Sequence, residues 1–431
     1  MGNGSAIFSF RGSGSGSTQV DLAFGSQQDA FGRLRTSQPY ELFSKANEFD
    51  NQPLFYQNTL TGSASQSYSS NTTSTTLSVA AASDTAIRTS RWYVRYRPGK
   101  SQQIFVTANF NGFEAGCVKR AGLFDDRDLG AARTGDGIFF EVNQATVPTG
   151  LFAVLRSSTS GASVETRFAQ ADWNVDPLDG SGPSGLVMDA ASLLNQQVMV
   201  FDFGWLGSAG VRWGFVLDGR LIIVHEYFPS NVITTPFMSV ASLPVRWEIS
   251  TLGAAGSMTA TCASVQSEGG FNTIGIRRST STGITPLTLT SNALKPLLSI
   301  RLKGAYRRGQ LQPVGYNVLA DGTDDYQTFL LINANLGGPA PTWTSNGDTI
   351  VEYSTNSTDT IVSFDSIISV GYGSAGGGPI KSLAETNPLE SDVPLTSTYD
   401  GTIDTLTLAI RPIPASPNTD FYGSLIWREF Y

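Results

Sequence analysis

Apolar residues along most of this chain recur at every second position, which is the spacing of an extended strand. In residues 92–97, Trp92, Val94 and Tyr96 fall on one face of such a strand, and polar or charged residues alternate with them. Similar runs, bounded by Gly, Pro, Asn and Asp, continue to the end of the chain. The best stretch with helical spacing, residues 189–199, is short. The pattern therefore predicts an all-β protein built from antiparallel sheets.

Turn residues between these runs predict two hairpins. Asp218-Gly219 separates two runs that are rich in aromatic and aliphatic residues, and this dipeptide suits a type I′ turn. Pro98-Gly99 separates residues 92–97 from the run that follows, so we expect these two runs to pair as well. Near the C-terminus, residues 405–410 alternate Leu or Ile with Thr or Ala, which predicts a half-buried antiparallel strand.

The density of these runs divides the chain into three parts. Residues 1–62 hold little that could form a core and include a Gly/Ser-rich tether, so we expect an extended N-terminal arm. Residues 63–275 hold about ten strand signals, the size of one antiparallel β-sandwich of jelly-roll or concanavalin-like type. Residues 276–431 show a second β pattern, which predicts a C-terminal β-domain.

Composition and charge exclude several classes of protein. Charged residues make up 15% of the chain, against roughly 25% in typical globular domains. The net charge of −8 argues against nucleic acid as a partner, because phosphate contacts need clustered Lys and Arg. No apolar run reaches about 18 residues, so no membrane span is predicted. The N-terminus has no secretory pattern, and Cys117 and Cys262 are expected to be free thiols in a reducing cytoplasm.

Few residues offer catalytic or metal-binding chemistry. The chain has one histidine, His225, which lies in a strand pattern, and no Gly-x-Ser-x-Gly elbow accompanies it. One His and two distant Cys argue against a zinc site. No glycine-rich stretch continues into the Lys-Ser/Thr of a phosphate-binding loop, so no cofactor is predicted. On these grounds the sequence predicts a protein that is not an enzyme.

Carboxylates cluster between Asp125 and Glu141. Asp126 and Asp128 resemble the start of a calcium loop, but the downstream Glu is missing, so whether the loop from Asp125 to Asp136 holds calcium stays open. A polar loop whose arginines pair with its aspartates is the favoured interpretation.

A glycosidase would need two opposed carboxylates in a cleft. Asp125, Asp136 and Glu141 are one candidate set, and Asp202 with Glu226 is another. The sequence does not show that either set converges, so this function is disfavoured.

The loop 171–189 carries a candidate glycan site. Trp173 lies among Asp172, Asp176 and Asp179, so its ring would stack on a sugar while the carboxylates accept bonds from hydroxyl groups. The alternative, which the sequence favours, is a long surface loop held by one buried tryptophan.

The segment 27–43 combines charge, aromatic residues and a proline. Asp29 is expected to pair with arginines across a turn, where Gly32 lets the chain bend and Pro39 keeps the next residues extended. Its apolar residues have no core of their own, so we expect them to anchor the arm on a sandwich, either their own or a neighbour's. The expected assembly residues are Phe31, Arg33, Leu34, Arg35, Pro39, Tyr40, Leu42 and Phe43.

The stretch "DAFGRLRTSQPYELF" resembles one near the N-terminus of many tailed-phage virion proteins, and of proteins from some large DNA viruses. Segments such as "AGLFDDRDLGAARTGDGIFFEV" and "FDFGWLGSAGVRWGFVLDGRLIIVHEYF" resemble the same family in order and spacing. The resemblance covers about residues 27–250. It implies a phage structural protein with a concanavalin-like or jelly-roll sandwich, and it implies no catalytic residue.

A virion structural protein is the function expected from this resemblance, made in the host cytoplasm and located in the virion. A tail-associated fibre or adaptor is the first expectation, and a capsid decoration or head-fibre protein is the alternative. A lectin-like module for a host-surface glycan is also open. The expected partners are other virion proteins and further copies of the chain, guessed as a trimer, with no nucleic acid and no membrane.

Overall fold

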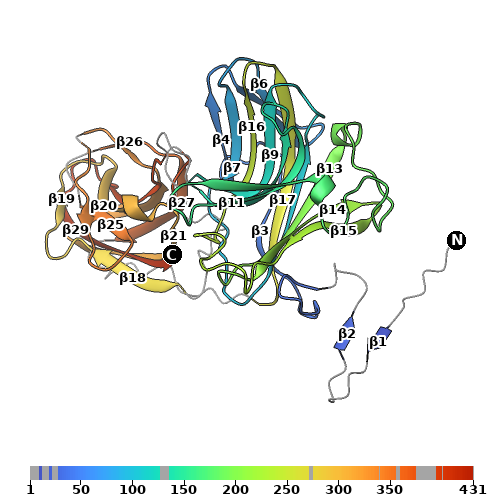
Figure 1. The fold of residues 1–431 in the computed structure, drawn as a ribbon. Coiled ribbons are helices and arrows are strands. Elements are labelled where there is room, and N and C mark those ends of the chain that lie inside the picture. The colour runs from blue at the N-terminus through green and yellow to red at the C-terminus, as the bar shows by residue number, and fades with distance from the viewer. Residues whose placement is uncertain are drawn as a thin grey trace. The chain divides into compact units, whose positions relative to one another are not determined.

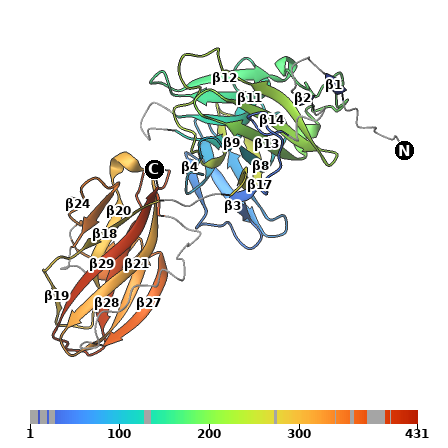
Figure 2. The same cartoon turned by 90° about the horizontal axis from the view of Figure 1, so that it is seen from below.

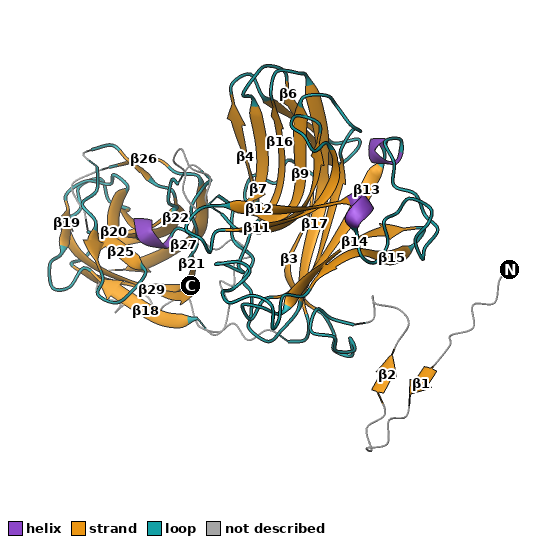
Figure 3. Cartoon of the chain, in the orientation of Figure 1, coloured by secondary structure: helices purple, strands orange, loops and turns teal. Residues whose placement is uncertain are grey.

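In the computed structural model of this chain, most described residues lie in strands, and the helical structure among them is confined to short 3-10 turns (Figure 3). The prediction of an all-β antiparallel sandwich is confirmed. No helix among the described residues is long and apolar enough to cross a membrane. The structure describes residues 9–11, 19–21, 28–126, 135–270, 275–338, 340–355, 360–374, 395–399 and 401–430.

The chain forms two compact units, and each is described by itself. The first unit comprises Met1–Ser90 and Val94–Asn272, and the second comprises Arg91–Tyr93 and Thr273–Tyr431. Residues 40–61, which the sequence placed in an extended arm, contain two strands of the first unit's sheets. They join these sheets because apolar side chains such as Phe43 and Tyr56 are buried there.

The first unit contains a seven-stranded antiparallel sheet in the order β12-β11-β10-β9-β16-β7-β4. Figure 1 shows its strands β4, β7, β16 and β9. Its strands are β4 (Tyr56–Thr61), β7 (Thr85–Ser90), β9 (Cys117–Phe124), β10 (Gly137–Asn143), β11 (Gly150–Ser157), β12 (Val164–Ala169) and β16 (Val245–Thr251).

A second antiparallel sheet of this unit has the order β15-β14-β13-β8-β17-β6-β5, with β3 pairing to β17. Its strands are β3 (Tyr40–Ala46), β5 (Ser65–Ser69), β6 (Ser74–Val79), β8 (Gln102–Asn109), β13 (Gln196–Gly204), β14 (Gly210–Leu217), β15 (Arg220–Tyr227) and β17 (Gly256–Ser267). Two short strands, β1 (Ser9–Arg11) and β2 (Gln19–Asp21), pair only with each other among the described strands.

Aromatic residues fill the space between the two sheets. The ring of Phe140 in β10 lies 4.4 Å from that of Phe215 and 5.5 Å from that of Phe201, centroid to centroid, and both partners belong to the other sheet. Trp247 of β16 is buried and donates its indole N–H across the core to the carbonyl of Thr107 at 3.2 Å. This core decides which face of each strand points outward.

One predicted hairpin is confirmed and the other is wrong. Strands β14 and β15 pair antiparallel across Asp218 and Gly219, whose φ angles of 49° and 69° are both positive, as a type I′ turn requires. Across Pro98-Gly99, in contrast, β7 and β8 belong to different sheets. The stretch 92–97 buries its apolar residues as expected, but among the described residues it pairs only through an isolated bridge at Val94.

The second unit contains a four-stranded sheet, β18-β29-β19 with β21 pairing to β29, and a six-stranded sheet, β24-β25-β20-β28-β22-β27. Figure 2 shows the long strands β21 and β29 side by side. A short pair, β23 with β26, completes it. The strands are β18 (Ile276–Ser281), β19 (Leu287–Leu289), β20 (Lys295–Leu302), β21 (Gln310–Asp321), β22 (Asp325–Ile332), β23 (Asn335–Leu336), β24 (Thr344–Ser345), β25 (Val351–Ser354), β26 (Ile361–Ser363), β27 (Ser366–Ser374), β28 (Thr405–Pro412) and β29 (Thr419–Phe430).

The strand β28 is antiparallel, as predicted, but it is buried on both faces rather than one. On one face, Leu406, Leu408 and Ile410 are buried in the main core of the second unit. Ala409 on the opposite face is equally buried, because it belongs to a smaller cluster with Leu331 and Ile361. The six-stranded sheet therefore carries apolar side chains on both of its faces.

Candidate functional site

An ion-pair cluster lies on the outer face of the seven-stranded sheet. Because Phe140 points into the core, its neighbour Glu141 points outward. The strand register places Glu141 opposite Arg120 of β9, and Arg120 opposite Glu248 of β16. Arg120 donates from Nε to Glu141 Oε2 at 2.8 Å and from Nη1 to Glu248 Oε1 at 3.2 Å. One arginine thus joins two carboxylates across three strands.

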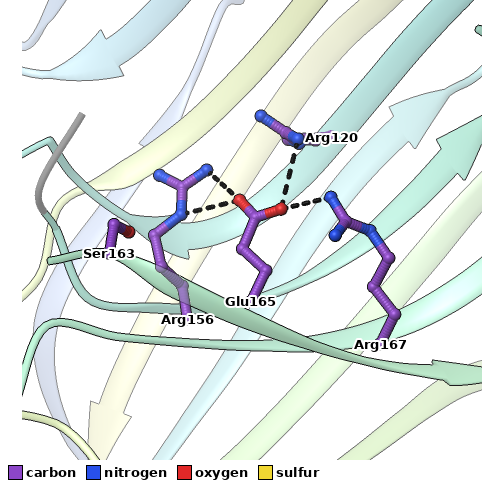
Figure 4. Close-up of a pocket in the computed structure, with 5 residues that line it drawn as sticks. All are labelled: Arg120, Arg156, Ser163, Glu165 and Arg167. Atoms are coloured by element: carbon purple, nitrogen blue, oxygen red, sulfur yellow. Dashed lines mark hydrogen bonds and ion pairs between the residues drawn. The ribbon is translucent and has the colours of Figure 1, made fainter. Parts of the chain in front are cut away.

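Glu165 of the edge strand β12 is the second centre of this cluster (Figure 4). Arg156 of β11 donates to its Oε1 from Nε at 3.0 Å and from Nη2 at 2.6 Å. Arg167 donates to Glu165 Oε2 and also to Glu141, at 2.7 Å from Nε to Oε1. Arg120 Nη2 lies 3.6 Å from Glu165 Oε2. Three guanidinium groups therefore converge on one carboxylate.

Aromatic rings pack against the guanidinium groups of two of these arginines, Arg120 and Arg156. Phe124, Phe139 and Phe152 form a small buried cluster with Val154 on the same face of the sheet. The guanidinium carbon of Arg156 lies 5.4 Å from the ring centroid of Phe124 and 5.2 Å from that of Phe139. A cation over an aromatic face is attracted by the ring quadrupole. The rings and the carboxylates together hold the arginines in one geometry.

The cluster opens into a pocket of about 360 Å³, lined by Arg120, Arg156, Ser163, Glu165 and Arg167. Ser163 lies just before β12 and donates to the carbonyl of Gly135 at 3.2 Å. Residues 127–134, which include Asp128 of the predicted calcium loop, lie outside the described residues. Among the described residues, no group of three or more His, Cys, Asp or Glu side chains is arranged to hold a metal ion.

Electrostatics keeps the lining of this pocket charged. Burial by itself would raise the pKa of Glu165, but attraction to Arg120, Arg156 and Arg167 outweighs it, so the pKa lies below its usual value. Burial would lower the pKa of Arg120, and the carboxylates of Glu165 and Glu248 reverse this and raise it. The pocket therefore offers fixed N–H donors beside an ionised acceptor.

Of the predicted carboxylates Asp125, Asp136 and Glu141, the first two adjoin each other, and each of the three accepts hydrogen bonds from different groups. Asp136 accepts hydrogen bonds from the hydroxyl groups of Ser158 at 3.0 Å and Ser239 at 2.7 Å. Asp125 accepts one from the backbone N–H of Asp136 at 3.1 Å, and Glu141 belongs to the arginine cluster.

The other candidate carboxylate set does meet at one residue. Arg212 of β14 pairs with Asp202 of β13, and its Nη1 lies 4.0 Å from Glu226 Oε1 of β15. Burial raises the pKa of Glu226, which Arg212 opposes. Asp202 is only 1% exposed, whereas the Glu226 side chain is 30% exposed, so only one of the two carboxylates is accessible.

The candidate glycan site of loop 171–189 is not assembled as an open site. The ring of Trp173 is 4% exposed and packs edge-on against Phe140, 5.9 Å between centroids. Asp176 is buried and accepts hydrogen bonds from the backbone N–H groups of Leu178 and Ser184. Asp172 and Asp179 remain exposed. The tryptophan ring holds the loop to the core and presents no face to a sugar.

His225 lies in β15 with 5% of its surface exposed. Its ring centroid is 4.2 Å from that of Phe168, and its Nδ1 accepts a hydrogen bond from the backbone N–H of Asn174 at 3.4 Å. Burial lowers the pKa of His225 to about 4. The imidazole is therefore neutral at physiological pH and serves as a packed aromatic ring.

The N-terminal motif forms a tight turn, and the predicted pairing of Asp29 with Arg33 is confirmed. Arg33 donates from Nε to Asp29 Oδ2 at 2.8 Å, and Asp29 also accepts the backbone N–H of Phe31. Arg35 behaves differently, because its Nη2 lies 2.7 Å from Asp202 Oδ2 and it also pairs with Glu268, the residue that follows β17. The motif is thus fastened to the outer face of the first unit's second sheet.

Other arm residues divide between buried and exposed positions. Phe43 of β3 is 2% exposed and its ring packs edge-on against that of Tyr56. Phe31 and Leu42 are half-buried, and Pro39 is exposed. Leu34 and Tyr40 keep 51% and 40% of their surface exposed. The arm is therefore anchored on its own unit, with two apolar side chains left at the surface.

The pocket residues Arg156, Glu165 and Arg167 were not singled out from the sequence, although a signal exists. In "VETRFA" two charged residues, Glu165 and Arg167, stand at alternate positions, and in "GLFAVLRS" one arginine, Arg156, interrupts an apolar strand. Opposite charges that face each other across strands favour pairing. Which strands are neighbours, however, is a property of the sheet order and not of any one segment.

Comparison with known proteins shows similarity at the level of fold. No family model matches the chain, and no curated protein matches its sequence. A legume lectin-like domain from Entamoeba histolytica has 12% identity and a TM-score of 0.33, covering 55% of this chain and 100% of that chain. A family 16 glycoside hydrolase endo-glucanase from Bacteroides ovatus has 9% identity and a TM-score of 0.35, and the match covers 52% of this chain and 99% of that chain. A Bacillus licheniformis beta-glucanase has 13% identity and a TM-score of 0.33, and the match covers 53% of this chain and 98% of that chain.

One expectation is corrected by this comparison. The sequence predicted a protein that is not an enzyme, whereas glucanases are among the structures similar to this chain. The expectation is withdrawn. At these identities the similarity concerns the β-sandwich alone, because one fold hosts many functions.

Substituting Arg35 should destabilise the first unit more than substituting Arg33. Arg35→Ala leaves buried Asp202 with one partner fewer, which we expect to cost about 2 kcal/mol. Arg33→Ala is the matched control, because the Arg33 side chain is 54% exposed and such pairs contribute about 0–1 kcal/mol. Denaturant titration of both variants measures the difference. If both variants lose the same free energy of unfolding, Arg35 does not anchor the motif.

Acidification should destabilise the protein through His225. The pKa of this residue is 6.5 when exposed and about 4 when folded, so the unfolded chain takes up a proton first. Stability from the neutral ring is complete above pH 6.5 and is lost as the pH falls toward 4. Unfolding midpoints measured between about pH 7.5 and about pH 5 should fall further for the wild type than for His225→Phe. If the unfolding midpoints of the wild type and His225→Phe fall equally with pH, the His225 ring does not titrate as described.

Proposed function

We propose that the first unit is a carbohydrate-binding module and that its site is the pocket lined by Arg120, Arg156, Ser163, Glu165 and Arg167. The observation that supports this is the convergence of guanidinium donors and an ionised carboxylate acceptor in one pocket. A sugar hydroxyl is both a donor and an acceptor, so it needs both kinds of partner close together. A pocket of donors alone would suit a simple anion instead.

The dimensions and rigidity of the pocket agree with this function. A volume of about 360 Å³ lies at the lower end of the range for small-molecule sites. The guanidinium group of Arg156 is held by Glu165 and by the rings of Phe124 and Phe139, and those of Arg120 and Arg167 are held by Glu141. Side chains ordered before binding do not have to be ordered by the ligand, which favours affinity.

Glycan binding should depend on Arg167, the most exposed arginine of the pocket, whose side chain is 29% exposed. A glycan array identifies the best ligand, and calorimetry then compares variants. Arg167→Ala should weaken binding about tenfold, equivalent to the loss of one charge-assisted hydrogen bond. Arg167→Lys should weaken it less, because the positive charge remains.

The control for this experiment is Arg33→Ala, which removes an arginine from the same unit outside the pocket. An array without any bound glycan, or unchanged affinity in Arg167→Ala, would contradict the proposed module. The same samples are assayed for product release from the bound polysaccharide. Release that is lost in Glu165→Gln would assign hydrolysis to this pocket in addition to binding.

We also propose, from the resemblance of residues 27–43 and the central segments, that the chain is a virion component, tail-associated or capsid-decorating. The observation that favours an assembly role is the exposure of Leu34 and Tyr40 on an arm that is otherwise fastened down. In this role the arm would contact another virion protein and the module would face a host-surface glycan.

Incorporation into particles tests this second role. A chain with both Leu34→Asp and Tyr40→Lys should enter phage particles at clearly reduced occupancy, because charges at these positions oppose burial against a partner. Arg33→Ala again serves as the control, and occupancy is measured by quantitative mass spectrometry of purified particles. Full occupancy of the double variant would restrict the arm to a role in folding.

A further inference from the structure

The strand β27 (Ser366–Ser374) forms one edge of the six-stranded sheet in the second unit. Among the described strands it pairs only with β22. It is nine residues long and contains neither a charged residue nor a proline. The opposite edge strand, β24, has only two residues. Proteins commonly protect sheet edges by shortening them or by adding charge, and β27 shows neither form of protection.

A register shift turns the apolar side chains of β27 to one face. Val370 lies opposite Phe329 of β22, and Ile367 lies opposite Leu331, with Ile368 as the extra residue between these pairs. Phe329 and Leu331 are two positions apart in β22 and therefore share a face. Val370 and Ile367 consequently share that face too, although three positions separate them. Ile368 packs against the main core instead.

The outward face of β27 is strongly apolar and exposed. Ile367, Val370 and Tyr372 have 42%, 47% and 68% of their surface exposed, and Phe364 just before the strand has 40%. We call these four residues the β27 patch. It adjoins Phe329 and the small buried cluster of Leu331, Ile361 and Ala409 on the outer face of the sheet. Contiguous exposed apolar surface of this kind marks an interaction site.

We propose that the β27 patch and the outer edge of β27, which has no partner among the described strands, bind a second copy of this chain, with the two β27 strands antiparallel about a two-fold axis. An edge strand is complementary to itself in this arrangement, since each copy offers the same unpaired N–H and C=O groups. The two apolar faces would then continue into each other across the axis.

Charge favours a second copy over another partner. The chain carries a net charge of −8, so two copies repel each other at long range. The neutral strand β27 lets two copies meet without like charges at the contact. A strongly charged partner could form no ion pair with this strand, because the strand contains no charged residue.

Sedimentation equilibrium of the full chain tests the proposal. The wild type should have twice the mass of the chain at high concentration and dissociate on dilution. Val370→Lys and Tyr372→Lys should each raise the dissociation constant at least about tenfold, because each places an unpaired charge in the interface. Ile284→Lys adds the same charge to another exposed apolar residue of the unit, 95% exposed, and should leave the constant unchanged.

Amide hydrogen exchange identifies the surface involved. Peptides that cover residues 366–374 should become more protected as the wild-type concentration rises, and Val370→Lys should abolish this change while its circular dichroism spectrum remains that of the wild type. A monomer at every concentration, a dimer insensitive to both lysine variants, or protection confined to other peptides would overturn the proposal. A trimer would also overturn it, because antiparallel pairing about a two-fold axis closes with two copies.

Discussion

The packing of Phe140 against Phe201 and Phe215 is the contact on which the arrangement of the first unit depends. Side chains alternate between the two faces of a strand, so a shift of one residue would exchange every inward and outward position. With Phe140 in the core, Glu141 must face outward, and the same alternation sends Arg120 and Glu248 to the outer face of their own strands. The aromatic core thus determines where the charged residues lie.

The resulting cluster of charged residues fixes the positions of its side chains more than it stabilises the fold. Removing several charges from water is costly, and pairing them recovers that cost only when the hydrogen bonds are well satisfied. Glu165 and Glu141 each accept bonds from two arginines, and rings beneath the guanidinium groups add attraction. A cluster of this kind holds its donors and acceptors in fixed positions before any ligand arrives, which is the property that a binding pocket needs.

The N-terminal motif connects to the same sandwich through its opposite sheet. The buried carboxylate of Asp202 pairs with Arg212 of the same sheet and with Arg35 of the arm. The motif therefore completes the outer face of that sheet. In the second unit the six-stranded sheet has no such cover among the described residues at β27, where apolar side chains stay exposed.

Local pattern alone determined much of this protein. Period-two alternation predicted the strands, and Asp218-Gly219 predicted a hairpin whose geometry the turn residues themselves dictate. The ion pair of Asp29 with Arg33 joins residues only four positions apart. Tertiary structure decided the rest. Pro98-Gly99 connects two different sheets, β28 is covered on both faces, and Arg35 pairs with a residue far along the chain. The pocket around Glu165 likewise depends on which strands become neighbours. Sheet order comes from packing between distant segments, so no single stretch of sequence contains it.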